Sequence, residues 1–115
     1  MKLYLDDERE APEGWIRVHT VPDLIHMVRN SANEVQVISL DHDLGEGELS
    51  GYDFLKWLEE EVAHARIKSI SEIHIHSANP AGVKNMQSAL QSIHRILLRI
   101  KNTQNNLEKL KGDSK

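Results

Sequence analysis

The chain has 115 residues, no cysteine and a formal net charge of −4 with histidine counted as neutral. This length suits one domain with a single core, and the missing cysteines exclude disulfides and thiolate metal sites. The acidic balance argues against a broad nucleic-acid footprint, and no apolar run approaches the ~20 residues that span a bilayer, so we expect a cytoplasmic protein without a membrane partner.

Four strands are predicted from stretches rich in β-branched, aromatic or continuous apolar residues: Lys2–Leu5, Trp15–Thr20, Val35–Leu40 and Glu72–Ser77. A loop joins the first two strands, and it is shorter than the dozen or more residues of an ordinary parallel connection. An extended loop at ~3.3 Å per residue could still return along the first strand, so we keep the two strands parallel. The near-continuous hydrophobicity of the third strand suits a central parallel strand. We therefore expect a mainly parallel sheet. The order 2-1-3-4 is expected because it would bring the carboxyl ends of the first, third and fourth strands together at one edge.

Each predicted helix follows a residue that can cap it. Thr20-x-x-Asp23 and Ser50-x-x-Asp53 are capping-box patterns, and Asn79 can cap a third helix with Pro80 in its first position. No strand signal follows, so this last helix is predicted to run from Pro80 to about Lys111.

The last helix carries a heptad seam with alternating spacings of three and four residues: Val83, Met86, Leu90, Ile93, Leu97, Ile100, Gln104 and Leu107. We expect a domain over residues 1–101, and a polar helical extension or tail over residues 102–115. The projecting seam predicts a homodimer; the alternative is a frayed tail after about Lys101.

Polar side chains follow three of the four strands. Asp6-Asp7 follow the first strand, Asp41-His42-Asp43 the third, and Ser77 lies at the end of the fourth. Because open α/β sheets bind ligands at the carboxyl ends of their strands, we expect one crevice there. Carboxylates at this edge could hold a divalent cation, since Mg²⁺ prefers hard oxygen ligands.

The fourth strand adds two histidines, and the helix after it adds a possible anion site. His74 and His76 share one strand face and could bind a metal, although we expect His74 to be a surface residue. The helix start at Asn79 has free amides that could bind an anion.

The order of elements resembles the receiver domain of two-component response regulators. Asp6, Asp7 and Asp41 match the Mg²⁺ ligands of that family, Asp41 matches its phosphoacceptor, and Ser77 matches the hydroxyl residue after the fourth strand. The resemblance implies a minimal receiver-like (flavodoxin-like) α/β fold of three layers. Two features depart from the family: a loop replaces the first helix, and the fifth strand with its switch lysine is missing.

The chain is more similar still to the cyclic-phosphate processing receiver domain family. The shared motifs are Lys-Leu-Tyr-Leu-Asp-Asp-Glu-Arg at residues 2–9, Pro12-x-Gly14-Trp15, Ile-Ser-Leu-Asp-His-Asp-Leu-Gly at residues 38–45, Ser50-Gly-Tyr-Asp53 and His76-Ser-Ala-Asn-Pro80. This resemblance implies an activity on cyclic phosphates in RNA or nucleotide repair.

The expected reaction is metal-dependent hydrolysis of a 2′,3′-cyclic phosphate on an RNA end or a nucleotide. The expected ligands of Mg²⁺, or of Mn²⁺ in its place, are Asp6, Asp7 and Asp41. An imidazole titrates near neutral pH and can serve as acid or base. The catalytic candidates are Asp41, His42, Asp43 and His76, and the phosphate-binding candidates are Arg9, Ser77, Asn79 and Gly82.

Three alternatives remain open at this point. Asp41 could be a nucleophile with Asp43 as the acid, as in the Asp-x-Asp phosphatases. The chain could be a dimeric signalling receiver that is phosphorylated on Asp41, or a module that binds a cyclic nucleotide without cleaving it. His42 could also point away from the crevice, because it alternates with Asp41 and Asp43.

Overall fold

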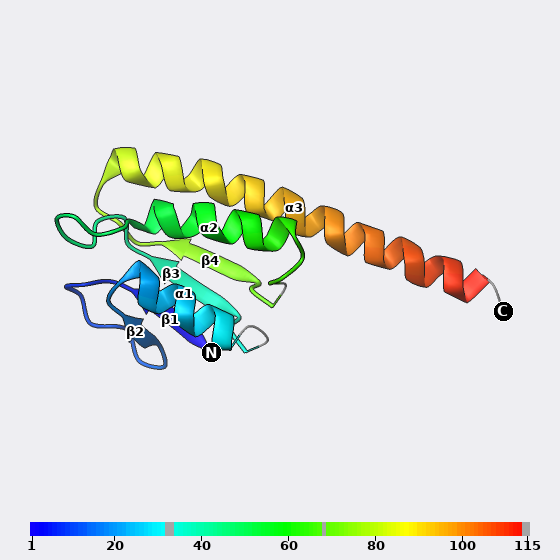
Figure 1. Cartoon of the computed structure of the whole chain (residues 1–115), viewed down its shortest axis with the longest axis horizontal. Coiled ribbons are helices and arrows are strands. Elements are labelled where there is room, and N and C mark those ends of the chain that lie inside the picture. Colours follow the sequence, from blue (N-terminus) through cyan, green and yellow to red (C-terminus); the bar gives the residue numbers. More distant parts are fainter. Residues whose placement is uncertain (32–33, 68, 114–115) are drawn as a thin grey trace.

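The computed structural model describes residues 1–31, 34–67 and 69–113, which form a four-stranded sheet and three helices. The strands are β1 (Lys2–Leu5), β2 (Ile16–Val18), β3 (Val37–Leu40) and β4 (Glu72–Ile75). The helices are α1 (Val21–Asn30), α2 (Gly51–Ala63) and α3 (Pro80–Asp113). All strand pairs are parallel and the order is β2-β1-β3-β4, so the predicted topology is confirmed (Figure 1).

The predicted capping residues start the helices. The Ser50 hydroxyl accepts the Asp53 amide at 3.3 Å and the Asp53 carboxylate accepts the Ser50 amide at 2.7 Å, which completes a capping box. Thr20 accepts the amide of Asp23 at 3.3 Å at the start of α1. The Asn79 side chain accepts the amide of Gly82 at the start of α3, at 3.0 Å. These bonds satisfy amides that have no partner inside a helix.

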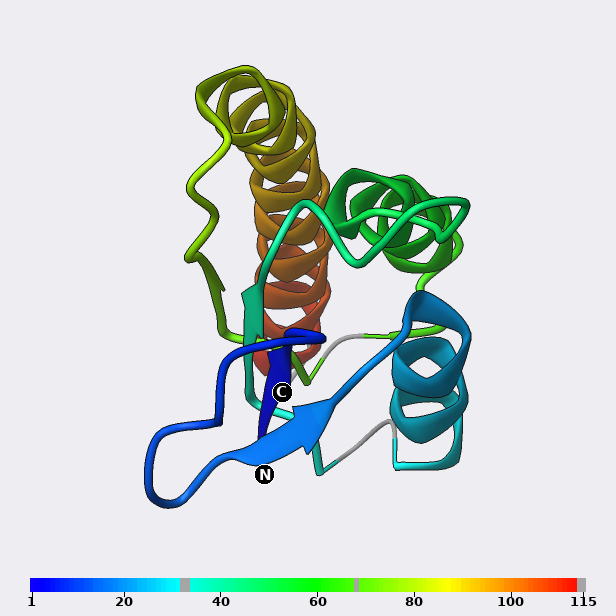
Figure 2. The same cartoon turned by 90° about the vertical axis from the view of Figure 1, so that its left-hand side faces the viewer.

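All three helices lie on one face of the sheet, so the fold has two layers where three were predicted (Figure 2). The connections from β2 to β3 and from β3 to β4 cross the sheet in the same direction. Right-handed crossovers that run in one direction place their helices on the same face. The segment between β1 and β2 would have to cover the other face, but it is a loop of residues 6–15.

The core lies between the sheet and the helices. On the helix side, each register position of the central strands holds an apolar residue, such as Leu3 beside Ile38 and Leu5 beside Leu40. These four side chains are fully buried, as are Leu24 of α1 and Phe54 of α2. Because side chains alternate along a strand, the open face receives the residues between them, which include Tyr4, Ser39 and His74.

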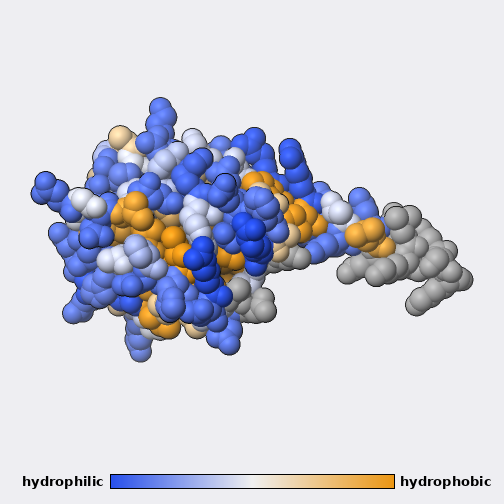
Figure 3. All heavy atoms as spheres, in the orientation of Figure 1, coloured by the Kyte–Doolittle hydropathy of each residue, from blue (hydrophilic) through white to orange (hydrophobic). Residues whose placement is uncertain are grey.

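Helix α3 extends well beyond the sheet. Its buried hydrophobic residues, Met86, Ala89 and Ile93, lie in its first half, whereas Leu98 and Leu107 are 58% and 55% exposed. Figure 3 shows hydrophobic atoms where α3 leaves the domain and again further along the projecting helix. The helix has no end at residue 101, so the expected domain boundary stays a prediction, and residues 114–115 lie outside the described residues. No helix in the described ranges is long and apolar enough to cross a membrane.

Candidate functional site

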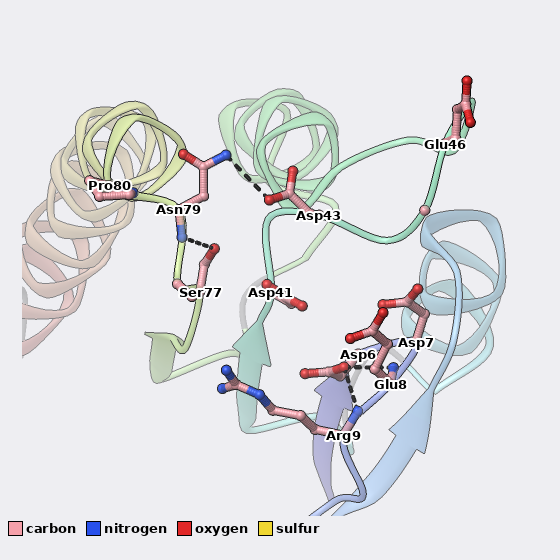
Figure 4. Close-up of a pocket in the computed structure, with 12 residues that line it drawn as sticks. Asp6, Asp7, Glu8, Arg9, Asp41, Asp43, Glu46, Ser77, Asn79 and Pro80 are labelled. Carbon is pink, nitrogen blue, oxygen red and sulfur yellow. Dashed lines mark hydrogen bonds between the residues drawn. The ribbon is translucent and has the colours of Figure 1, made fainter.

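A pocket of about 740 Å³ lies at the carboxyl ends of β1, β3 and β4 (Figure 4). The described residues that line it are Asp6, Asp7, Glu8, Arg9, Asp41, Asp43, Gly45, Glu46, Ser77, Ala78, Asn79 and Pro80. Six of the twelve are acidic, and Arg9 is the one cation among the described lining residues. The predicted crevice therefore exists, and its charge is strongly negative.

Asp6 is the buried acid of the pocket, with 1% of its surface exposed. One carboxylate oxygen accepts the amides of Glu8 and Arg9, each at 2.8 Å, and the other lies 3.1 Å from Nε2 of His76. Burial raises the pKa of Asp6, but the hydrogen bonds from Arg9, Glu8 and His76 outweigh it and hold this pKa below its ordinary value. Asp6 is therefore ionised at neutral pH.

Asp41 follows β3 and is half-buried. Its Oδ1 accepts the amide of His42 at 2.8 Å, and its own amide donates to the carbonyl of Leu5 at 3.0 Å. The first residue of α2, Gly51, packs directly against the backbone of Asp41. A Cβ built on Gly51 would lie 2.1 Å from the carbonyl oxygen of Asp41. Only a glycine at this position lets the helix begin so close to the acid.

Asp43 lies at the mouth of the pocket and is exposed. It accepts hydrogen bonds from His42 Nδ1 at 2.9 Å and from the Asn79 side-chain amide at 3.2 Å. These two hydrogen bonds hold the pKa of Asp43 below its ordinary value, and the His42 bond has the larger effect. Asn79 therefore joins the loop after β3 to the start of α3, as Figure 4 shows.

His42 and Gly82 lie beside the pocket and do not line it. The imidazole of His42 occupies the space where a side chain at residue 82 would be, since a Cβ built on Gly82 would lie 2.5 Å from the ring. The amide of Gly82 donates to Asn79, which leaves it unavailable to a phosphate. His42 thus points away from the crevice, the second of the orientations that the sequence allowed.

Arg9 and Ser77 lie on the same side of the pocket. Arg9 Nη1 donates to the carbonyl of His76 at 3.2 Å, and Ser77 Oγ accepts the amide of Asn79 at 3.2 Å. Both residues were candidates for phosphate binding, and both line the pocket. Glu46 also lines it but points away from the other carboxylates in Figure 4.

Three side chains come close enough to share one cation within the described part of the chain: Asp6, Asp41 and His76. One ligand atom of each lies within 4.8 Å of the corresponding atoms of the other two. Two carboxylates and an imidazole form a donor set that fits a divalent ion. Asp7 lines the same pocket near Gly45 but is not one of these three clustered side chains. Its role as a metal ligand therefore stays a prediction.

The family model for the cyclic-phosphate processing receiver domain matches residues 1–92. The chain belongs to this family. A search of curated proteins finds no significant match. A solved signal receiver domain from Vibrio parahaemolyticus is similar with 16% identity and a TM-score of 0.43, over 85% of this chain and 93% of that one.

Two residues that the sequence did not single out, Ser39 and Tyr4, contact His76 in this chain. Ser39 is 5% exposed and its Oγ lies 2.7 Å from Nδ1 of His76. The ring of Tyr4 stacks on His76 with centroids 4.1 Å apart and planes within 3°. Ser39 had a signal in the sequence: it is a hydroxyl inside the apolar run Val35–Leu40, and a buried hydroxyl needs a partner. Nothing in the sequence pointed to Tyr4.

Proposed function

We propose that the protein is a metal-dependent phosphoesterase that opens a 2′,3′-cyclic phosphate on an RNA end or a nucleotide. The observation that carries the proposal is the gathering of Asp6, Asp41 and Asp43 in one pocket of a cyclic-phosphate processing receiver domain. Carboxylates repel an anionic phosphodiester, so this pocket needs a cation before such a substrate can enter. Mg²⁺ or Mn²⁺ would offset the phosphate charge and lower the pKa of a bound water.

The phosphate-binding groups of the proposal are the side chains of Arg9 and Ser77, which line the pocket. The Arg9 guanidinium has further N–H groups besides the one that holds the carbonyl of His76, and it can donate them to non-bridging phosphate oxygens. Ser77 can donate its hydroxyl proton to the same group, since its oxygen already accepts the amide of Asn79. Together, the donors of Arg9 and Ser77 would hold the phosphate group of the substrate beside Asp41.

Ring opening needs a water to attack the phosphorus and a proton for the departing ribose oxygen. Asp43 is exposed at the pocket mouth, and its lowered pKa keeps it ionised, so it can orient the attacking water. The assignment of acid and base to His42 and His76 stays a prediction. The positions of these rings favour a structural role for His42, which packs on Gly82, over direct contact with substrate.

The test is incubation of the full chain with 2′,3′-cyclic nucleotides and RNA oligonucleotides that end in 2′,3′-cyclic phosphate. Products are followed by phosphorus NMR in the presence of Mg²⁺, Mn²⁺ or EDTA. We expect a phosphomonoester product that depends on metal and is lost in Asp41→Asn. Asp23→Asn is the matched control, because it removes the same charge from an exposed position in the first turn of α1. The absence of metal-dependent product across this panel would contradict the proposal.

The same experiment separates the alternatives. Covalent catalysis by Asp41 predicts that labelled oxygen from water enters this side chain during turnover. A signalling receiver predicts stable phosphorylation of Asp41 by acetyl phosphate without turnover of a cyclic phosphate, and a binding module predicts tight binding of an unchanged ligand.

A further inference from the structure

The imidazole of His76 is held on three sides. Its Nδ1 lies 2.7 Å from Ser39 Oγ, its Nε2 lies 3.1 Å from Oδ2 of Asp6, and its ring stacks on Tyr4. His74, two residues earlier and on the same face of the sheet, is exposed and hydrogen-bonds Glu72. His76, directly after β4, is therefore fixed in one orientation, while His74 within β4 is a surface residue.

The fixed orientation points Nε2 at the acids of the pocket. Two ligand atoms that each lie about 2.1 Å from one ion and are cis to one another are about 3.0 Å apart. The observed 3.1 Å between Nε2 of His76 and Oδ2 of Asp6 agrees with that spacing, and Asp41 brings a third ligand atom within 4.8 Å of both. The same atoms can therefore form a hydrogen bond or hold a cation between them.

Ser39 gives the imidazole the partner that a metal-binding histidine requires. A histidine that binds a metal through Nε2 carries its proton on Nδ1, and a second group usually accepts that proton and fixes the ring. The hydroxyl of Ser39 can donate to Nδ1 or accept from it, because its hydrogen rotates. Its burial in β3 keeps water from taking this place.

We propose that His76 is the third protein ligand of the cation, with Ser39 and Tyr4 as positioning residues, and that the site selects a first-row transition ion over Mg²⁺. This inference rests on the metal dependence of the proposed function and specifies its ligand set. It replaces the acid or base role of His76, because a nitrogen bound to a cation cannot take up or release a proton. Imidazole binds transition metals in preference to Mg²⁺, which takes oxygen ligands and water. A site built from Asp6, Asp7 and Asp41 alone has no nitrogen ligand, and would lack this source of preference for a transition ion over Mg²⁺.

The first test uses the unmodified chain loaded with Mn²⁺, which is paramagnetic. Pulsed electron paramagnetic resonance detects nitrogen nuclei bonded to Mn²⁺, and we expect coupling to one imidazole nitrogen. The coupling should disappear in His76→Ala and persist in His74→Ala, the matched control from the same face of β4. A bound Mn²⁺ without nitrogen coupling in the unmodified chain would overturn the proposal even if no variant folds.

The second test compares affinities by calorimetry with Mn²⁺, Co²⁺ and Mg²⁺. We expect His76→Ala to weaken Mn²⁺ and Co²⁺ binding at least tenfold and Mg²⁺ binding much less, and Ser39→Ala to weaken Mn²⁺ binding about tenfold. His74→Ala should leave all three affinities unchanged. Equal losses for Mn²⁺ and Mg²⁺ in His76→Ala would show that the ring acts only by supporting Asp6, and would overturn the proposal.

The two proposals can fail separately. Hydrolysis of a cyclic phosphate with no nitrogen coupling would leave the proposed function standing and remove His76 from the ligand set. Nitrogen coupling from His76 without any hydrolysis would support the ligand set and contradict the proposed activity.

Discussion

The two faces of the sheet differ in what their side chains do, although the same strands supply both. The covered face carries fully buried apolar residues such as Leu3, Ile38 and Leu40. The open face carries Tyr4 and Ser39, whose ring and hydroxyl contact His76. Because alternation along a strand assigns neighbours to opposite faces, one strand can stabilise the fold and support the site independently. Substitutions on the two faces should therefore have separable effects.

The largest effect on stability is expected from the covered face. Ile38→Ala should lower the free energy of unfolding by about 2–5 kcal/mol, because it removes methyl groups from a fully buried position and leaves a cavity. Val37→Ala, its half-buried neighbour on the open face, should cost less than about 1 kcal/mol. Urea denaturation of both variants measures this difference. Equal losses would mean that the two faces do not differ as described.

Gly51→Ala should affect both the fold and the site, because the start of α2 touches the backbone of Asp41. An added Cβ would lie 2.1 Å from the Asp41 carbonyl oxygen and 2.8 Å from the Met86 side chain, so the helix must shift, at a cost of about 1–3 kcal/mol. We also expect weaker metal binding, measured by calorimetry. Gly47→Ala is the control: a Cβ there meets nothing within 4 Å, so it should lose stability only through its positive φ. Unchanged metal affinity in Gly51→Ala would show that the position of the start of α2 does not affect metal binding, and would contradict this prediction.

Tyr4→Leu should have a small effect on the free energy of unfolding and should change the orientation of the His76 ring without affecting His74. The substitution removes the stacking of Tyr4 on His76, which is worth about 0.5–1.5 kcal/mol between aromatic rings, and keeps most of the apolar area. The resonances of the His76 ring should shift and broaden in NMR spectra, while those of His74 stay unchanged. If the His76 resonances did not change, the open face would not be what orients this ring.

The smallest effect on the domain is expected from the projecting half of α3, which belongs to neither face of the sheet. The homodimer stays a prediction, supported by Leu107, a residue of the heptad seam that is 55% exposed. The variant Leu107→Glu should be monomeric in analytical ultracentrifugation, where the unmodified chain should be dimeric. Urea unfolding of the domain, compared at a concentration where both chains are monomeric, should change by no more than about 0.5 kcal/mol. A monomeric unmodified chain would refute the homodimer.

The central strand and the helix starts could be predicted because local signals determine them. The apolar run before Asp41 predicted a central strand, and Ser50 and Thr20 predicted helix starts that hydrogen bonds now confirm. The second strand was predicted too long: it was expected at Trp15–Thr20, and it pairs with β1 only over Ile16–Val18. Propensity alone does not show where an edge strand stops pairing.

The directions of the site side chains could not be predicted, because alternation holds only inside a strand. β3 ends at Leu40, so the loop after it decides where Asp41 and His42 point. The packing of His42 on Gly82 depends on the approach of α3, which is distant in sequence. The third layer was expected from the receiver resemblance, although the loop between β1 and β2 already removed the helix that would have formed it.

The cation site at the strand ends is tested most directly by a metal titration of the full chain by calorimetry. We expect binding of a divalent ion at one site, with the affinity lost in Asp6→Asn and in Asp41→Asn. Asp23→Asn should bind like the unmodified chain, because its carboxylate lies outside the pocket. Binding that survives in Asp41→Asn, or no binding in the unmodified chain at millimolar metal, would contradict a cation site at these strand ends.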